Sequence, residues 1–358
     1  MKRTLILFAA LAATAAFAQQ DKPAESKLDE KTEALVRQSI PVCKEMTITR
    51  AELQQSLPLG LKGALVRVAS PRPACEGQYL IATSPVSGDF YIGLPWVLGE
   101  VEGKTIEEKL KNFAWTGLQE NFTPVVTRER TRNGLLPVSM LEMTEQGKVA
   151  LEGEIDPEAK VFFLGHFVPA TGDLGAARIK TFEPRLANAP TRGAAKPDVT
   201  VVEFSDFECP SCKHASTYLD PIMEKYGDRV RYIRYDLPLI TSHPWAFAAA
   251  MAGRAIYRQK PEAFWDYKKQ IYSNQDKLTT FTFDDFARGF AQDHDLDMKR
   301  YDADISSAEV RDELLKSVGA AFSNGVRATP TYMVNGKFVD AGDEGKALEP
   351  YVAGLLKK

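Results

Sequence analysis

Two cysteines, Cys209 and Cys212, are separated only by Pro210 and Ser211, and this spacing could support redox chemistry. A free cysteine has a pKa of about 8.5, so only about 3% of it is thiolate at pH 7. A Cys-X-X-Cys turn at a helix N-terminus lowers that pKa, and the thiolate is the nucleophile of thiol-disulfide exchange. The spacing therefore predicts a redox pair in which Cys209 attacks and Cys212 closes or releases the disulfide.

Two other interpretations of this cysteine pair remain open. A zinc half-site needs two more ligands at similar spacing, but the chain has no second Cys-X-X-Cys and no matching histidine pair. A purely structural disulfide across so short a loop is uncommon. The redox interpretation is the favoured one.

The residues around the pair predict a strand, a turn and a helix. Apolar residues occupy both faces of the run 199–204, which is typical of a strand covered on both sides in a mostly parallel sheet. Pro210 suits the first turn of a helix and places Cys209 at the helix N-terminus. The unpaired N–H groups and the helix dipole favour an anion there, here a thiolate.

Further elements are expected downstream of the cysteine pair. A second strand is predicted over 229–236, and a hairpin of 331–334 with 337–339 turns at Asn335-Gly336. Helical periodicity predicts four intervening helices, and Ser306 and Glu309 form a capping box at the start of the last one. The four predicted helices are Ala246–Arg258, Glu262–Ser273, Phe283–Asp293 and Ala308–Asn324.

Two motifs together resemble one protein family. The segments FSDFECPSCKHASTYLDPIMEKYG and GVRATPTYMVNGKFV resemble the DsbA/DsbG-like branch of the thioredoxin superfamily, over roughly 196–358. The resemblance implies an α/β thioredoxin fold over 198–358 with a helical insertion at about 240–325. Its members are exported thiol-disulfide oxidoreductases, in which Cys209 would be the nucleophile and Cys212 the second cysteine. No cofactor or metal is expected.

The resemblance also implies roles for three other residues. A buried acid six residues before the nucleophile matches Glu203, which would assist proton transfer at Cys212; an exposed carboxylate on an edge strand is the alternative. Pro330 matches a cis-proline that lies against the Cys-X-X-Cys turn. Few X-Pro bonds are cis, so this expectation comes from the family. The backbone of Thr329 would then be free to pair with an extended substrate.

The direction of the reaction stays open. Threonine at position 329 resembles the isomerase and reductase members, whereas the strongest oxidases tend to have valine. The inner dipeptide Pro210-Ser211 also lacks the histidine of the most oxidising members.

The N-terminus predicts export. Residues 1–18 have the basic start, short apolar run and small-x-small ending of a signal peptide, with a retained amphipathic anchor as the alternative. Residues 19–39 form a charged leader, either mobile or a short exposed helix. A periplasmic or otherwise extracytoplasmic location permits disulfides, so Cys43 and Cys75 are expected to form a structural one. A second redox pair, an interchain link or two free thiols are the alternatives.

The segment 40–182 is predicted to be an α+β domain with a faint repeat, and 183–197, rich in proline and alanine, a linker. The strings Phe90–Gly93 and Phe162–Gly165 lie 72 residues apart and suggest an old duplication. Residues 153–172 also resemble the N-terminal domain of DsbC/DsbG-type isomerases, which mediates dimerisation. The domain could therefore form a homodimer or bind substrate.

The sequence as a whole predicts an exported enzyme that exchanges disulfides with unfolded or partly oxidised exported proteins and is reset by a membrane redox partner. A net charge of -3 offers no sign of nucleic-acid binding. One alternative is a dimeric isomerase or reductase of DsbC/DsbG type. Another is a chaperone or assembly-binding module in which the cysteines are incidental.

Overall fold

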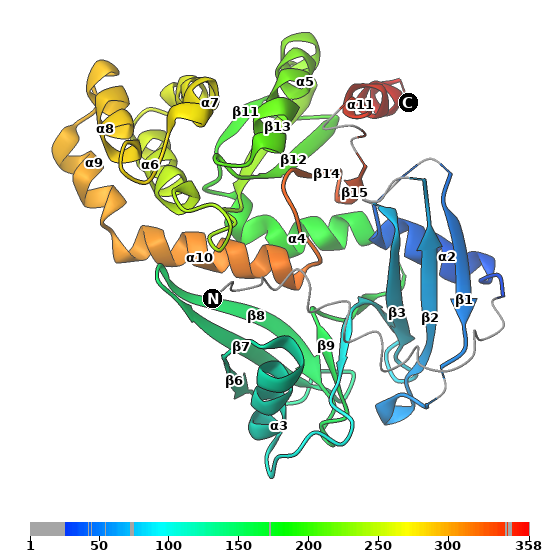
Figure 1. Ribbon diagram of the computed structural model, residues 1–358. Helices are drawn as coiled ribbons and strands as arrows, with labels where there is room; N and C mark the ends of the chain where they lie inside the picture. The colour runs from blue at the N-terminus through cyan, green and yellow to red at the C-terminus, as the bar shows by residue number, and fades with distance from the viewer. Residues whose placement is uncertain are drawn as a thin grey trace.

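The computed structural model describes residues 26–357 except 42, 44, 54, 72–74, 172, 341 and 343–345. The predicted signal peptide lies outside the described residues. Three five-stranded sheets form the framework (Figure 1), and we call them the N-terminal, middle and C-terminal sheets. No helix in the described part of the chain is both long and apolar enough to cross a bilayer.

The C-terminal sheet has the strand order β11-β13-β12-β14-β15, and β12 and β13 run parallel. Helices α5 and α11 pack on one face, and α4 and α10 pack on the other (Figure 1). Both faces of β12 are therefore buried, as its apolar pattern predicts. The bounds are β11 Thr191–Gly193, β12 Val199–Ser205, β13 Val230–Asp236, β14 Thr331–Val334, β15 Lys337–Val339, α4 Leu174–Leu186, α5 Pro210–Tyr226, α10 Ala308–Ser323 and α11 Leu348–Leu356.

Five helices connect β13 to β14, and the four predicted ones are confirmed. The fifth, α9, escaped prediction because it is mostly polar and buries only Tyr301. The predicted cap of α10 is wrong by one residue: Ser307 accepts from the Val310 amide at 3.3 Å, while Ser306 bonds back to Asp302. The other four helices are α6 Ala246–Gln259, α7 Ala263–Asn274, α8 Phe283–Asp293 and α9 Met298–Ile305.

The region before α4 contains two units with the same order of elements, a helix followed by four antiparallel strands and one short strand. The first unit holds α2 Glu30–Ser39, β1 Thr47–Ala51, β2 Lys62–Ala69, β3 Gly77–Thr83, β4 Asp89–Gly93 and β5 Pro95–Val97. The second holds α3 Ile106–Phe113, β6 Phe122–Val126, β7 Leu136–Thr144, β8 Gly147–Ile155, β9 Val161–Leu164 and β10 Val168–Pro169.

Each unit gives its last short strand to the other unit's sheet. Strand β10 pairs with β4 in the N-terminal sheet, and β5 pairs with β9 in the middle sheet. Phe90 of β4 is opposite Val168 of β10. The residue 72 positions after Phe90 is Phe162 of β9, which is opposite Trp96 of β5. The same shift relates Val168 to Trp96. The two exchanges therefore have equivalent registers.

Two predicted boundaries differ from the structure. The leader includes α2, capped by Asp29, which buries Val36 against the N-terminal sheet, so the first unit begins before residue 40. The predicted linker 183–197 contains the end of α4 and strand β11, which pairs with β13. Burial of Phe182 and the pairing of β11 outweigh the local proline and alanine composition.

The middle sheet and the C-terminal sheet share one hydrophobic core, and α10 lies between them (Figure 1). Buried residues of this core include Phe162 from β9, Leu315 from α10 and Phe204 from β12. A side chain at Gly319 would collide with the Ala150 carbonyl of β8, so glycine permits this close approach. Nearby, the Glu152 amide donates to Ser323 Oγ at 2.8 Å.

Candidate active site

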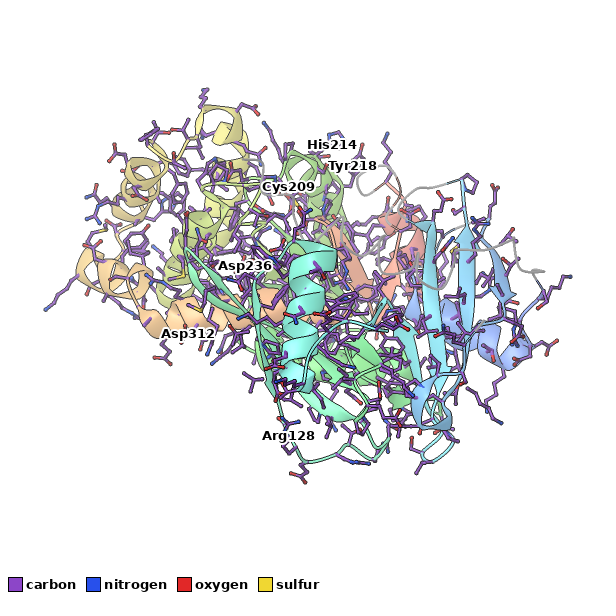
Figure 2. The ribbon with its side chains drawn as sticks, turned by 60° about the horizontal axis from the view of Figure 1, so that its bottom comes forward. Arg128, Cys209, His214, Tyr218, Asp236 and Asp312 are labelled. Atoms are coloured by element: carbon purple, nitrogen blue, oxygen red, sulfur yellow. A yellow bond between two sulfur atoms is a disulfide. The ribbon has the colours of Figure 1, made fainter. Side chains whose placement is uncertain are left out.

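Cys209 occupies the N-cap of α5 and Pro210 its first turn. The amides of Cys212 and Lys213 donate to the Cys209 carbonyl at 3.1 and 3.2 Å, which closes the turn. Only 6% of Cys209 is exposed and Cys212 is fully buried. Figure 2 shows Cys209 at the start of α5, with His214 and Tyr218 further along the same helix.

The two thiols have opposite electrostatic environments. A hydrogen bond from Cys212, opposed by burial, lowers the pKa of Cys209 well below that of a free cysteine, to about 6. Burial first, and then the neighbouring Cys209, raise the pKa of Cys212. At pH 7 about nine-tenths of Cys209 would be thiolate, while Cys212 keeps its proton. One cysteine is a ready nucleophile, and the other must lose a proton before it can react.

The peptide bond between Thr329 and Pro330 is cis and lies beside the cysteines. The Thr329 carbonyl oxygen is 3.4 Å from Cys209 Sγ. Strand β14 begins two residues later, at Thr331, and pairs with β12. Thr329 Oγ1 is buried with no hydrogen-bond partner in the described part of the chain. The structure thus brings Thr329 and Pro330 together with the cysteine pair.

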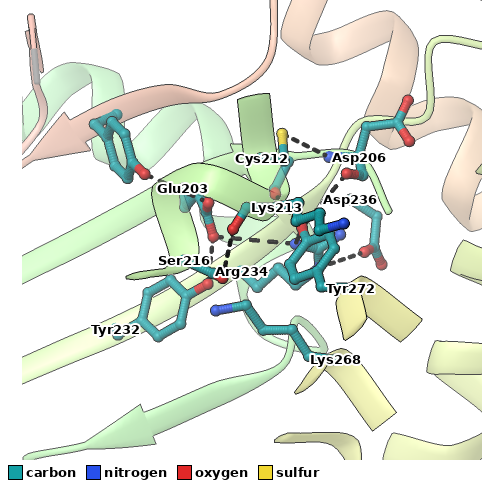
Figure 3. A network of polar contacts seen from close by, with 12 residues as sticks. Glu203, Asp206, Cys212, Lys213, Ser216, Tyr232, Arg234, Asp236, Lys268 and Tyr272 are labelled. Atoms are coloured by element: carbon teal, nitrogen blue, oxygen red, sulfur yellow. Dashed lines mark hydrogen bonds and ion pairs between the residues drawn. The ribbon is translucent and has the colours of Figure 1, made fainter. Parts of the chain in front are cut away.

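Glu203 is fully buried on β12, which lies between β13 and β14, so it is not on an edge strand. Its carboxylate accepts hydrogen bonds from Tyr232 and, at 3.5 Å, from Tyr332 (Figure 3). Arg234 on β13 lies opposite it in register, with Nη1 4.0 Å from Oε2. The negative charge of Glu203 contributes to raising the pKa of Cys212. The acid is therefore close enough to act electrostatically on the buried thiol.

Two buried cations accompany Glu203 and were not foreseen. Arg234 stacks over the Phe207 ring at 3.8 Å and donates to Tyr272 at 3.1 Å. Lys268 from α7 is 2% exposed, and burial lowers its pKa. Its Nζ is 3.5 Å from the nearest carboxylate oxygen, on Asp220. No local motif marks either cation, because they come from β13 and α7 and meet Glu203 only in the folded chain.

A second set of polar residues positions the turn. The Asp206 amide donates to Cys212 Sγ at 3.5 Å, and its carboxylate bonds to His243 Nδ1 at 2.8 Å. This hydrogen bond raises the pKa of His243. Gln275 Nε2 donates to the Cys209 carbonyl at 3.1 Å. The helical insertion, through His243 and Gln275, thus fixes the turn that carries the cysteines.

The other two cysteines lie in the first unit. A disulfide links Cys43 to Cys75, with 6.4 Å between the Cα atoms and a sequence separation of 32. Asp340 lies close to both sulfurs and completes a group of residue types that can ligate a metal, but the disulfide leaves neither sulfur as a thiolate ligand. Within the described residues, Cys209 and Cys212 belong to no such group.

Comparison with known proteins matches the C-terminal half. A family model described as thioredoxin matches residues 186–352. The helical insertion lies between β13 and β14, as the resemblance to the DsbA branch predicts. This C-terminal region is a thioredoxin-like domain. The predicted fold class is confirmed for it, and the match begins inside the segment that was predicted to be a linker.

Solved structures that are similar to part of this chain include two bacterial proteins. Oxidised BdbD from Bacillus subtilis is 21% identical, with a TM-score of 0.43, over 48% of this chain and 95% of that chain. The catalytic domain of ScsC from Proteus mirabilis is 20% identical, with a TM-score of 0.42, over 51% of this chain and 98% of that chain.

Curated relatives match only in part. A Na(+)/H(+) antiporter NhaA 3 of Salinispora tropica is 36% identical over 41% of this chain and 21% of its own length. A Na(+)/H(+) antiporter NhaA of Herminiimonas arsenicoxydans is 32% identical over 47% of this chain and 25% of its own length. The chain spans about a quarter of the length of these relatives.

Proposed function

We propose that this protein is an extracytoplasmic thiol-disulfide oxidoreductase that acts on exported proteins. The observation that carries the proposal is the placement of the cysteine pair: Cys209 caps helix α5 beside the cis-proline segment, and Cys212 is fully buried behind it. This environment lowers the pKa of Cys209 to about 6 and raises that of Cys212. A stabilised thiolate makes Cys209 a good nucleophile when reduced and a good leaving group when oxidised.

In the oxidising direction, a substrate thiolate attacks Cys209 Sγ of the Cys209–Cys212 disulfide and Cys212 leaves as a thiolate. A second substrate thiolate then attacks the mixed disulfide, and Cys209 leaves as a thiolate. The substrate gains a disulfide and loses two electrons, and the protein gains them. A membrane redox partner would remove those electrons.

In the reverse direction, the Cys209 thiolate attacks a substrate disulfide, and Cys212 then attacks Cys209 Sγ to release the reduced substrate. Cys212 must first lose its proton, and Glu203, which is buried nearby, is the proposed acceptor. The backbone at Thr329 and Pro330 is proposed to hold the substrate segment beside Cys209.

The isomerase or reductase direction is a second candidate. Thr329 precedes the cis-proline, and a cavity next to this segment offers a place for an extended segment of a substrate protein. Replacing both Cys209 and Cys212 with serine separates these enzymes from a chaperone with incidental cysteines, because only the chaperone would keep its activity.

The deciding experiment is the reduction potential of the Cys209/Cys212 couple against glutathione, in protein with Cys43 and Cys75 replaced by alanine. A value near about -120 mV supports a disulfide donor, and one below about -200 mV supports an isomerase or reductase that is kept reduced. A couple that cannot be cycled would overturn the proposed function.

A further inference from the structure

A cavity of about 960 Å³ lies next to the cis-proline segment and is separate from the cysteine pair. Pro330 and Thr331 form part of its wall, and the end of α10 and one side of α4 form another part. Tyr79 and Tyr91 of the N-terminal sheet close it on the opposite side. The cavity therefore lies where a chain that passes over the cis-proline would meet the first unit.

The charge of the cavity is predominantly positive. Its described lining contains three arginines, Arg67, Arg178 and Arg327, against a single carboxylate, Glu76. His166, also in the lining, is 3.4 Å from Glu154. A substrate segment that enters this cavity would meet an excess of guanidinium groups.

Arg327 is the cation nearest in sequence to the cis-proline. Its Nη1 donates to main-chain carbonyls of Phe322 and Val326, and its charge acts on the hydroxyls of Tyr79 and Tyr91. In the described part of the chain no carboxylate forms an ion pair with it, and burial lowers its pKa to about 10. Arg327 is partly buried and faces the cavity, so an anionic ligand that enters the cavity would supply the counterion that it lacks there.

Arg178 of α4 repeats the arrangement. Its guanidinium donates to main-chain carbonyls of Gln38, Ser39 and Gly336 and lies 4.7 Å from the centre of the Phe338 ring. None of its hydrogen bonds in the described structure goes to a carboxylate, and burial lowers its pKa to about 10. Main-chain dipoles and an aromatic ring thus hold two guanidinium groups beside one cavity.

We propose that this cavity binds an extended substrate segment through an acidic side chain, whose carboxylate pairs with Arg327. The inference rests on the proposed function and gives it a substrate class: proteins with an Asp or Glu near the cysteine that reacts with Cys209. Arg178 adds long-range attraction, and the tyrosines provide the apolar wall against which the segment packs.

The test compares peptides that differ at one position. A disulfide-linked fluorogenic peptide is prepared with Glu, Gln or Lys at each of several positions around its cysteine. The expected result is an about tenfold lower KM for the Glu peptide at one position, an advantage that falls as salt is raised. No advantage for Glu over Gln at any position in the wild-type protein overturns the proposal.

Substitutions in the protein test whether Arg327 is responsible for the preference for the Glu peptide. Arg327→Gln should bring the Glu-to-Gln ratio close to one, and Arg327→Lys should restore part of it. Arg128→Gln is the matched control, because Arg128 is 63% exposed, pairs with Glu107 and lies far from Cys209 (Figure 2). A ratio that survives Arg327→Gln overturns the proposal, whereas failure to exchange with any peptide would instead overturn the proposed function.

The reciprocal strand exchange carries a second, independent inference. Both sheets of the N-terminal half are completed from within one chain, with equivalent registers shifted by 72 positions. The rings of Tyr91 and Phe167 stack with their centres 5.3 Å apart. A shift of 72 positions relates Tyr91 to Phe163 and Phe167 to Pro95, and Phe163 and Pro95 are paired where β5 joins β9. We infer that the two units are a duplicated pair that makes a second copy of the chain unnecessary.

This inference predicts that the protein is a monomer, with one Cys209/Cys212 pair for the two units of its N-terminal half. Light scattering coupled to size exclusion should show one chain per particle from micromolar to high micromolar concentration. A protease site placed in the exposed turn at 99–103 should, after cutting, leave the two fragments together on the column. A dimer that dissociates when β5 or β10 is altered would show exchange between chains and overturn the inference.

Discussion

The two cysteine pairs of this chain have different surroundings. Cys209 and Cys212 are three positions apart at the start of a helix, within a buried network of acids and cations. Cys43 and Cys75 are far apart in sequence and join the segment after α2 to the segment before β3. A cysteine pair becomes reactive when its environment lowers the pKa of one thiol and raises that of the other. Two thiols that are merely close together do not have this reactivity.

The largest effect that distinguishes the pairs should come from Cys209→Ser. Without the nucleophile we expect the rate of disulfide exchange to fall at least about 10³-fold. Reduction of insulin by the protein in the presence of dithiothreitol measures this, with Cys43→Ala/Cys75→Ala as the matched control. If the control loses as much activity as Cys209→Ser, the two pairs do not have separate roles.

Cys212→Ser should give a different signature, because the nucleophile remains while the resolving thiol is lost. The mixed disulfide between Cys209 and the substrate should then accumulate and appear as a heavier band on non-reducing gels. Mass spectrometry should place the link at Cys209. Links at Cys43 or Cys75 would show that the wrong pair has been assigned to catalysis.

Glu203→Gln should slow the release of the mixed disulfide about 10²-fold, because the proposed proton acceptor for Cys212 is removed. The informative measurement is the release rate against pH, and the deficit should shrink as rising pH lets water and hydroxide take the proton. A deficit that is the same at every pH would indicate a structural role for Glu203.

Removal of the Cys43–Cys75 disulfide should act on stability. We expect Cys43→Ala/Cys75→Ala to lower the free energy of unfolding by about 2–4 kcal/mol, through the loss of the cross-link in the unfolded chain. Urea denaturation of the oxidised proteins measures it. An unchanged midpoint would mean that this disulfide does not stabilise the fold.

A further expected effect is a pH dependence of the stability of the reduced protein. Because folding lowers the pKa of Cys209 to about 6, its thiolate stabilises the fold fully above about pH 9, and this contribution is lost as pH falls through 6. Cys212, whose pKa is raised, contributes in the opposite sense only above about pH 9. Between pH 6 and 8.5, reduced wild type should therefore gain stability relative to Cys209→Ser, and parallel curves would contradict this.

The sequence allowed the chemical centre to be predicted, because its signals are local. The strand, the Cys-Pro-Ser-Cys turn, the helix and the hairpin after Pro330 all appear as periodicity or turn residues. Arg234, Lys268 and Asp206 could not be assigned roles, since each acquires its partner only when distant elements meet. The exchanged strands β5 and β10 are too short to show an alternating pattern.

The core that α10 shares between the middle and C-terminal sheets limits how this protein can evolve by recombination. An isolated redox domain would expose Leu315, Val318 and Phe322, which now lie under the middle sheet. Gene fragments cut at the boundary between the halves would therefore encode poorly soluble products. The two halves are expected to be inherited together and to accumulate compensating substitutions around Gly319 and Ala150.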